Sequence, residues 1–202
     1  MIYSIYIKGL FDKLLAIVLG IFLLPWLILI FILLFITQGN TVFYMQMRSG
    51  KDQRKFKLYK FRTLVPSDSN NLSMENRHFT FFGNVMRRSG LDELPQLINI
   101  LKGEMSFVGP RPLPIEYEGK YNEVQVFRFR AKPGITGWAQ IHGKNDISWS
   151  QRFDLDLWYV DHISLLLDLK ISWLTLIQFI SSIFSANKKH VEMELFKDSN
   201  MK

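Results

Sequence analysis

Two adjacent carboxylates, Asp92 and Glu93, stand in residues 89–96 of an otherwise strongly basic chain. Pro95 follows them, and because proline fits the first turn of a helix, this stretch predicts a helix that begins near Asp92. The free N–H groups and the positive end of the helix dipole would favour ionised carboxylates there and attract a phosphate. An ionised Asp92 could then attack phosphorus. Acidic residues are also common in first turns that carry out no chemistry, so the surrounding residues must decide between the two interpretations.

Helical patterns lie on both sides of this acidic pair. Residues 82–88 have a helical pattern that ends at Ser89 and Gly90. After the pair, apolar residues recur at helical spacing, and we expect them to face a core: Leu91, Leu94, Ile98 and Leu101.

Composition limits the class of protein. The chain has 202 residues, which favours one domain with a packed core after the N-terminal region. Its net charge of +7 indicates an anionic partner, and nucleic acid, anionic lipid and nucleotide all qualify. The chain has no cysteine, which excludes disulfides and thiolate metal sites. The histidines show no metal-ligand spacing, and we assign no chemistry to them: His78, His142, His162 and His190.

Residues 14–36 are uncharged and almost wholly apolar, which indicates a membrane segment. As a helix this run would be about 35 Å long, enough to cross a bilayer core. Its length and the presence of Trp26 argue against a cleaved signal peptide. Pro25 is predicted to kink the helix, because proline removes a backbone hydrogen bond and clashes with the preceding turn.

Basic residues flank both ends of this run, with Lys8 and Lys13 before it and several lysines and arginines within residues 48–62. The positive-inside tendency therefore draws both ends to the cytoplasm, which a re-entrant helix would satisfy. A single span with a tolerated proline is the commoner architecture, and charge alone leaves both open. A second apolar region, residues 163–184, is predicted either to lie in the membrane interface or to be a buried helix of the soluble domain.

Strand and loop signals occupy the remaining chain. Residues 41–44 and 55–62 predict two strands, the second of which alternates basic and apolar residues. Residues 67–76, rich in serine, asparagine and charge, predict a surface loop.

Three further loops contain glycine or proline. Residues 109–112 hold Arg111 between two prolines in a stiff loop, which suits a fork-like contact with phosphate, carboxylate or a base edge. A solvent-exposed arginine in a proline-rich turn is the alternative. Residues 131–138 and 143–146 form the other two loops, and all three could line one pocket.

The proline-broken apolar segment and four motifs together resemble the small monotopic polyprenol-phosphate phosphoglycosyl transferases, also called bacterial sugar transferases. The motifs occur in the family's order and span nearly the whole chain; they are residues 59–63, 91–97, 109–112 and 133–140. The resemblance implies transfer of a sugar-1-phosphate from a UDP-sugar to polyprenyl (undecaprenyl) phosphate with release of UMP, as the first membrane step of glycoconjugate assembly. It also implies a location on the cytoplasmic face of the bacterial inner membrane, with downstream glycosyltransferases among the partners.

The resemblance further implies roles for individual residues. Asp92 would form a covalent phospho-sugar intermediate, Glu93 would support it as an acid or base, and Mg²⁺ would bridge these carboxylates and the diphosphate. Substrate-binding roles fall on residues that match the family's basic and acidic positions: Lys60, Arg62, Arg87, Arg111, Lys144, Asp156 and Asp168. For Asp168 a structural role is the alternative.

Two residues depart from the family's pattern. Leu24 precedes the kinking Pro25 where relatives often have serine, whose hydroxyl could bond a freed backbone carbonyl, so the kink angle is in doubt. Lys144 stands where some relatives carry arginine, and exchanging a planar fork for a point charge could alter donor recognition.

The predicted fold class is α+β. We expect mostly helices, a small antiparallel sheet within residues 41–63, and amphipathic helices that rest on the membrane. Residues 1–40 would form the re-entrant membrane helix, and residues 41–202 a cytoplasmic catalytic domain resting on the membrane.

Three other functions fit part of the sequence. A noncatalytic membrane-anchored adaptor would bind anionic lipid through its basic residues and would not need Asp92. Nucleic-acid binding fits the charge, but the basic residues lie beside a membrane segment and no nucleic-acid-binding motif is present. A membrane nucleotide-sugar hydrolase would use the same Asp92 with water as acceptor, and dependence on polyprenyl phosphate would separate it from the transferase.

Overall fold

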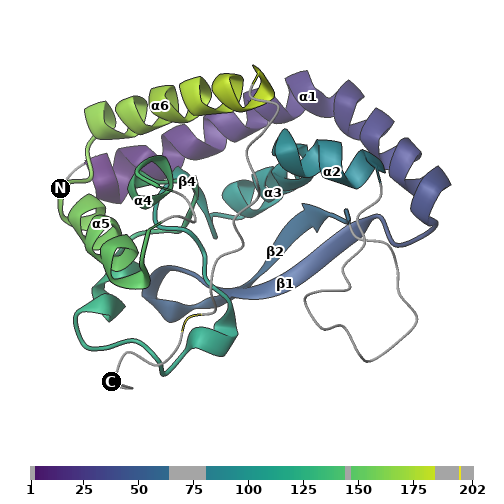
Figure 1. The fold of residues 1–202 in the computed structure, drawn as a ribbon. Helices are drawn as coiled ribbons and strands as arrows, with labels where there is room; N and C mark the ends of the chain where they lie inside the picture. Colours follow the sequence, from purple (N-terminus) through teal and green to yellow (C-terminus); the bar gives the residue numbers. More distant parts are fainter. Residues whose placement is uncertain (1–2, 64–80, 144–146, 185–195, 197–202) are drawn as a thin grey trace.

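The computed structural model describes residues 3–63, 81–143, 147–184 and 196. Its longest element is helix α1 (Lys8–Gln38), which follows a π-helical turn, η1 (Tyr3–Ile7). The predicted apolar run lies inside α1, and α1 is long and apolar enough to cross a membrane. Pro25 lies within the helix, and Figure 1 shows the second half of α1 running at an angle to the first. Gly39 ends the helix with a φ of 70°, a conformation that suits glycine.

One face of α1 packs on the rest of the protein along both halves of the helix. In the first half, Ala16 packs with Phe56 and Leu97. In the second half, Leu34 packs with Met86. The other faces of α1 expose large apolar side chains, among them Leu10, Leu14, Val18, Ile21, Phe22, Trp26, Ile32 and Ile36. Both ends of α1 thus contact the same body while most of its surface stays uncovered.

An antiparallel hairpin lies on the far side of helix α3 (Gln96–Leu101) from α1 (Figure 1). Strands β1 (Phe43–Ser49) and β2 (Lys55–Phe61) pair in register from Phe43 opposite Phe61 to Ser49 opposite Lys55. A 3₁₀ turn, η2 (Lys51–Gln53), joins them. The predicted small antiparallel sheet is confirmed, and its first strand is longer than the four residues expected. Because side chains alternate along β2, Phe56 and Leu58 enter the core on the same face that presents Lys60.

The acidic pair lies between two helices, α2 (Phe81–Arg88) and α3 (Gln96–Leu101). The expected helix start near Asp92 is wrong, because Asp92 belongs to a separate 3₁₀ turn, η4 (Leu91–Glu93). Pro95 explains the difference: it has no N–H to donate to the preceding turn, and the chain closes tighter bonds there, from Leu94 N–H to the Leu91 carbonyl.

The predicted core face of this region is half right. Leu91 and Leu94 pack against the cluster that contains Met86. Ile98 and Leu101, however, are 44% and 40% exposed, and their neighbours Leu97, Asn99 and Ile100 are buried instead. A 3₁₀ turn has about three residues per turn and an α-helix has about 3.6. The side chains of α3 therefore point in other directions than they would if one α-helix ran from Leu91 to Leu101, and a single helical period applied to the whole segment selects the wrong face.

A second sheet was not expected from the sequence. Strand β3 (Ser106–Val108) and strand β4 (Gly134–Thr136) pair in parallel, Ser106 opposite Gly134 and Val108 opposite Thr136. These strands begin the loops that carry Arg111 and Trp138, so the pairing brings two of the three predicted loops together. The predicted surface loop at 67–76 and most of the third loop, 143–146, lie outside the described residues.

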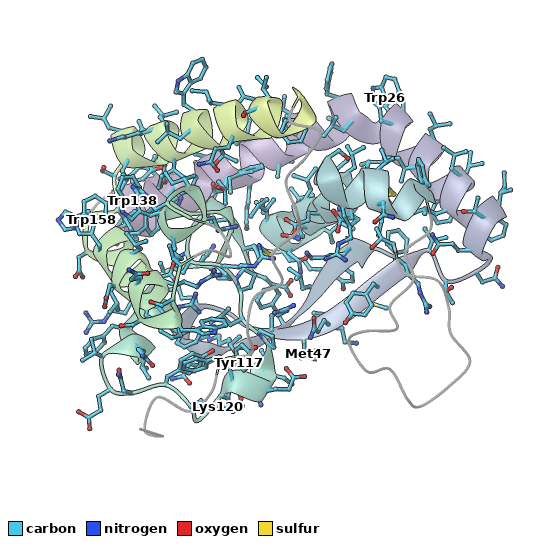
Figure 2. All side chains as sticks on the ribbon, viewed as in Figure 1. Trp26, Met47, Tyr117, Lys120, Trp138 and Trp158 are labelled. Atoms are coloured by element: carbon cyan, nitrogen blue, oxygen red, sulfur yellow. The ribbon has the colours of Figure 1, made fainter. Side chains whose placement is uncertain are left out.

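Further 3₁₀ and α-helices follow β3 in the described chain. In chain order they are η5 (Ile115–Tyr117), η6 (Gln125–Arg130), α4 (Trp138–Ile141), α5 (Trp149–Asp161) and α6 (Leu165–Phe184). Ser148 and Gln151 form a reciprocal capping box at the start of α5. Trp138 of α4 and Trp158 of α5 stack with ring centroids 4.8 Å apart, at the edge of the molecule in Figure 2. The mostly helical α+β class is confirmed.

Helix α6 covers most of the second apolar region. One side of it is buried through Asp168 and Ile171. Its other sides expose apolar residues, which are Leu165, Leu166, Leu169, Trp173, Leu176, Ile177, Phe179 and Ile180. A helix fully buried in the soluble domain is therefore excluded.

Glycines make the close approach of the β3 and β4 loops sterically feasible. A β-carbon on Gly134 would lie 2.1 Å from the backbone nitrogen of Gly109. A β-carbon on Gly109 would lie 2.2 Å from the carbonyl oxygen of Lys132. Both contacts are with backbone atoms, which cannot rotate away as a side chain would.

We predict that Gly134→Ala lowers the free energy of unfolding by about 3 kcal/mol, the upper range for overpacking. Thermal unfolding of the purified protein measures this effect. The control is Gly20→Ala, because a β-carbon at Gly20 in α1 meets nothing within 4 Å. That variant should unfold at the same or a higher temperature, since alanine is the better helix residue. An unchanged midpoint for Gly134→Ala would contradict the steric argument.

Candidate active site

An ion pair joins the acidic turn to the hairpin. The Nζ of Lys60, on β2, lies 2.5 Å from Oε1 of Glu93, on η4. Both side chains are largely buried, with 19% and 24% of their surface exposed. The structure thus brings Lys60, which belongs to one motif, to the acidic pair of Asp92 and Glu93, which belongs to another motif further along the chain.

Asn99 fixes the position of this ion pair. Its side chain is fully buried and lies on α3, immediately after the acidic turn. Its Oδ1 accepts a hydrogen bond from the Tyr59 N–H at 3.2 Å, and its Nδ2 donates to the Lys57 carbonyl at 2.7 Å. One side chain therefore holds the backbone of β2 on both sides of Leu58, next to Lys60. Such side chain to backbone bonds specify a register that packing of apolar residues alone would leave loose.

The two carboxylates have different electrostatic environments. Burial and the neighbouring charge of Glu93 raise the pKa of Asp92 to about 6, although Lys60 and Arg87 oppose this shift. Burial alone would also raise the pKa of Glu93. The positive charges of Lys60, Arg111 and Arg48 outweigh burial there and lower the pKa of Glu93 below its usual value. Glu93 is therefore ionised and paired, while Asp92 changes charge close to neutral pH.

A depression opens beside Glu93, and most of its polar side chains are cationic. It is lined by Arg48, Leu58, Lys60, Glu93, Gln96, Arg111, Pro112, Gly134 and Ile135. Two of the predicted loops contribute to it, as expected, through Arg111 and Gly134. Three cations face one ionised carboxylate at this place, so the depression carries excess positive charge.

Arg48 is a member of this depression that sequence reasoning missed as a site residue. Its guanidinium donates to the Gln46 side chain at 2.7 Å and to the Pro112 carbonyl at 3.3 Å. Its Nε is buried and has no hydrogen-bond partner among the described residues. Burial and the nearby charge of Arg111 lower the pKa of Arg48 to about 10. Arg48 lies on β1, which pairs with the strand of Lys60, and this pairing could have indicated that it lies near the site. Its position relative to Lys60 depends on the register of the two strands, which the sequence does not show.

Asp156 supports the loop of Arg111 from behind. It is buried on α5 and accepts two hydrogen bonds from Arg128, at 2.7 and 3.1 Å. Arg128 also donates to the carbonyl oxygen of Arg111, at 2.8 Å. The side chains of Arg128 and Asp156 are each only 2% exposed. The position of Asp156 therefore fits support of the Arg111 loop through Arg128.

The other candidate substrate-binding residues are spread more widely. Arg87 is exposed and close enough to Asp92 to influence its pKa. Arg62 is half-buried at the end of β2, where its N–H donates to the Val42 carbonyl. Lys144 lies outside the described residues.

Asp168 belongs to a different buried network. It accepts hydrogen bonds from Lys8 at 2.5 Å, from Tyr3 at 2.7 Å and from Tyr159 at 2.7 Å. These contacts join the starts of α1 and α6 to α5. Burial and Asp168 raise the pKa of Tyr159, so its hydroxyl stays a donor at any physiological pH. The geometry of this network fits a structural role.

The donor set at the acidic pair fits a cation that arrives with an anionic substrate. Among residues 3–63, 81–143, 147–184 and 196, no group of three or more possible metal ligands comes together. Glu93 is engaged with Lys60, which leaves Asp92 as the accessible carboxylate. Mg²⁺ commonly uses one or two carboxylates together with substrate phosphates and water, and this site could supply its share of such a set.

Comparison with known proteins identifies the family. The model of the family described as bacterial sugar transferase matches residues 3–182. The chain belongs to the bacterial sugar transferase family. As a member it is an enzyme, and each of the four segments that carry the resemblance contributes residues to the depression.

Similar proteins occur in several bacteria. The uncharacterized sugar transferase EpsL of Bacillus subtilis (strain 168) is 47% identical over 163 residues, which cover 80% of this chain and 81% of that protein. The exopolysaccharide production protein ExoY of Sinorhizobium fredii (strain NBRC 101917 / NGR234) is 37% identical over 84% of this chain and 83% of its own length. The UDP-glucose:undecaprenyl-phosphate glucose-1-phosphate transferase of Xanthomonas campestris pv. campestris is 35% identical over 88% of this chain. The match spans 40% of that longer protein.

We predict that Asp156→Ala destabilises this bacterial sugar transferase by about 3–5 kcal/mol, because it leaves the buried charge of Arg128 unpaired. The measurement is thermal unfolding beside an activity assay. Asp154→Ala, an exposed residue of the same helix, is the control and should change neither. If Asp156 bound substrate directly, its removal would instead reduce activity while the unfolding midpoint stayed at the wild-type value.

Proposed function

We propose that this protein transfers a sugar-1-phosphate from a UDP-sugar to undecaprenyl phosphate and releases UMP. Two relatives are named for such a reaction, the enzymes of Xanthomonas campestris and Escherichia coli (strain K12) called UDP-glucose:undecaprenyl-phosphate glucose-1-phosphate transferase. The observation that carries the proposal is the cation-rich depression lined by Glu93, whose neighbour in the chain, Asp92, has a pKa of about 6. A nucleotide diphosphate would supply the missing negative charge, and Asp92 would supply the nucleophile.

In the first step, a carboxylate oxygen of Asp92 attacks the phosphorus that carries the sugar. The bond between that phosphorus and the oxygen bridging to UMP breaks, so UMP leaves and the phospho-sugar is held on Asp92. Negative charge grows on the phosphate of UMP as the bond breaks. Arg48 and Arg111 line the depression and would stabilise that charge. The unpartnered Nε of Arg48 offers a donor for this purpose.

In the second step, a phosphate oxygen of undecaprenyl phosphate attacks the same phosphorus. The bond to Asp92 breaks, which restores its carboxylate and forms a sugar diphosphate lipid. Neither step requires net gain or loss of a proton, since each exchanges one phosphorus–oxygen bond for another. Glu93 then has no proton to transfer, and its bond to Lys60 indicates that it acts by holding that cation beside the reacting phosphate.

Mg²⁺ belongs to the proposal as a companion of the diphosphate. Asp92 would be its protein ligand and phosphate oxygens the others, and the ion would neutralise charge on the diphosphate. Lys60 and Arg87 would share that neutralisation from the protein side.

Asp92→Asn is predicted to abolish transfer, because the amide keeps the size of the side chain and loses its nucleophilic charge. The assay follows UMP release by purified protein with Mg²⁺, undecaprenyl phosphate and a panel of UDP-sugars, each component omitted in turn. Wild-type release should need one donor class, the acceptor for sustained turnover, and Mg²⁺. Activity in Asp92→Asn would refute the nucleophile. UMP release without acceptor through many turnovers would support the hydrolase, and silence of a folded wild-type protein with every donor would support the adaptor.

The rate of the first step should fall as pH drops through about 6, because Asp92 must be ionised to attack and its raised pKa brings protonation into this range. Lys60→Met should move this limb to higher pH, since it removes a positive charge that lowers the pKa of Asp92. Rapid measurement of UMP release between about pH 5 and 8, a range that includes the raised pKa of Asp92, tests both predictions. Lys57→Met is the control, an exposed lysine on the other face of β2, and should leave the limb in place. A limb near pH 4 would contradict the assignment.

The proposed location is the cytoplasmic face of the bacterial inner membrane, with α1 entering one leaflet and returning. Both halves of α1 pack on the same domain, which supports a re-entrant path, because a helix that crossed the bilayer would leave the domain. The exposed apolar residues of α1 and α6 would be unfavourable in water, and lipid would cover them. Trp26 points away from the domain in Figure 2, as a lipid-facing residue would.

Single-cysteine labelling can test this topology, because the chain has no cysteine of its own. We predict that Tyr6→Cys, before α1, and Asn122→Cys, in the catalytic domain, both react with an impermeant maleimide from the cytoplasmic side. Both positions are exposed in the structure. Inverted vesicles should label both and intact spheroplasts neither. Labelling of Tyr6→Cys alone in spheroplasts would establish a true span.

A further inference from the structure

Lysines gather at the start of α1, away from the acidic pair. The Nζ of Lys132 lies 3.7 Å, and the Nζ of Lys13 3.8 Å, from the point where a β-carbon on Gly103 would stand. The Nζ of Lys132 also lies 3.8 Å from the corresponding point on Gly9 of α1. Two ammonium groups from distant parts of the sequence therefore meet over the small residues Gly9 and Gly103.

A third lysine adds to this charge. Lys51, in η2, is close enough for its charge to lower the pKa of Lys132, as do Lys13 and Lys8, after the larger effect of burial. We call Lys13, Lys51 and Lys132 the lysine cluster. None of the three lines the depression beside Glu93.

The surrounding carboxylates leave this cluster with excess positive charge. Lys8 is paired with Asp168 and needs no further partner. Asp12 is a carboxylate that acts on Lys132, and the positive charges of Lys13 and Lys51 act against it. The end of α3, where Gly103 lies, presents backbone carbonyls that attract a lysine, but a partial charge there does not balance three ammonium groups.

The depth of the cluster points to the kind of anion that would complete it. Lys13 immediately precedes Leu14, where the apolar run of α1 begins. Lipid phosphates lie at such a boundary between charged and apolar residues, and basic side chains there bind anionic lipids.

We propose that the lysine cluster binds the phosphate of an anionic membrane phospholipid, at a site separate from the reaction centre. The lipid phosphate would lie between Lys13 and Lys132, and its acyl chains would lie along the exposed apolar face of α1. The site is independent of the reaction that the protein catalyses.

The test titrates dihexanoyl-phosphatidylglycerol into the full-length protein in a neutral detergent and follows the thermal unfolding midpoint. Dihexanoyl-phosphatidylcholine, whose zwitterionic headgroup has no net charge, is the comparison. The anionic lipid should raise the midpoint at lower concentration than the zwitterionic one. Lys13→Gln and Lys132→Gln should each raise the half-saturating concentration about five-fold, the effect of one basic residue near a lipid surface. Lys57→Gln, an exposed lysine on β2 with the same change of charge, should leave it unchanged.

Two further readouts separate this site from the alternatives. UMP release at saturating donor and acceptor should stay at the wild-type rate in Lys13→Gln and Lys132→Gln. The concentration of undecaprenyl phosphate that gives half the maximal rate should also stay at its wild-type value. Weakened use of undecaprenyl phosphate, with phosphatidylglycerol binding intact, would overturn the proposal and make the cluster an acceptor site. Equal loss in Lys57→Gln would overturn it as general charge attraction. If Lys132→Gln fails to fold, Lys51→Gln, which is exposed, replaces it with the same expected weakening.

Discussion

The contact between Lys60 and Glu93 is the interaction on which the candidate site depends. Two adjacent carboxylates in a partly buried turn repel one another, and burial favours protonation of both. Lys60 holds Glu93 in its ionised form, while burial and the neighbouring charge of Glu93 raise the pKa of Asp92 to about 6, although Lys60 opposes that shift. One member of the pair becomes a fixed charge and the other a group that changes charge near neutral pH. An acidic pair without such a partner would have neither property, which is why the motif alone could not separate chemistry from an ordinary helix start.

The ion pair in turn requires three segments to keep their positions. Asn99 bonds the backbone of β2 to α3 and so sets where Lys60 stands relative to the acidic turn. Gly109 and Gly134 let the backbones of two loops touch, which brings Arg111 to the same depression. Arg128 holds the Arg111 carbonyl from the buried side. Polar and steric constraints of this kind are directional, whereas the apolar clusters around them tolerate small displacements. A few hydrogen bonds and close contacts thus position the site. The apolar core supplies the stability that offsets the free-energy cost of ordering these groups.

The sequence predicted the parts of this protein that local patterns determine. The apolar run of α1, the hairpin strands and helix α2 follow from composition, alternation and periodicity, and the family motifs named Asp92, Glu93, Lys60 and Arg111 together. Features that depend on distant residues were missed. The parallel pairing of β3 with β4 joins three-residue strands whose own sequences look like loops. The buried face of α3 was misassigned because the 3₁₀ turn before it changes the period. Arg48 gave no local signal, since its place in the depression depends on the hairpin register and on Pro112.

Helix α1 is more closely tied to the site than an anchor would need to be. The cluster that contains Ala16 includes Leu97, just after the acidic turn, and the cluster that contains Leu34 is completed by Leu91 and Leu94, within and beside it. The two halves of α1 therefore close the core on both sides of Asp92. Because the remaining faces of α1 are apolar and uncovered, the helix can hold this position at low cost only where lipid covers them. Lipid cover of α1 and assembly of the acidic turn would then be coupled through the same buried residues.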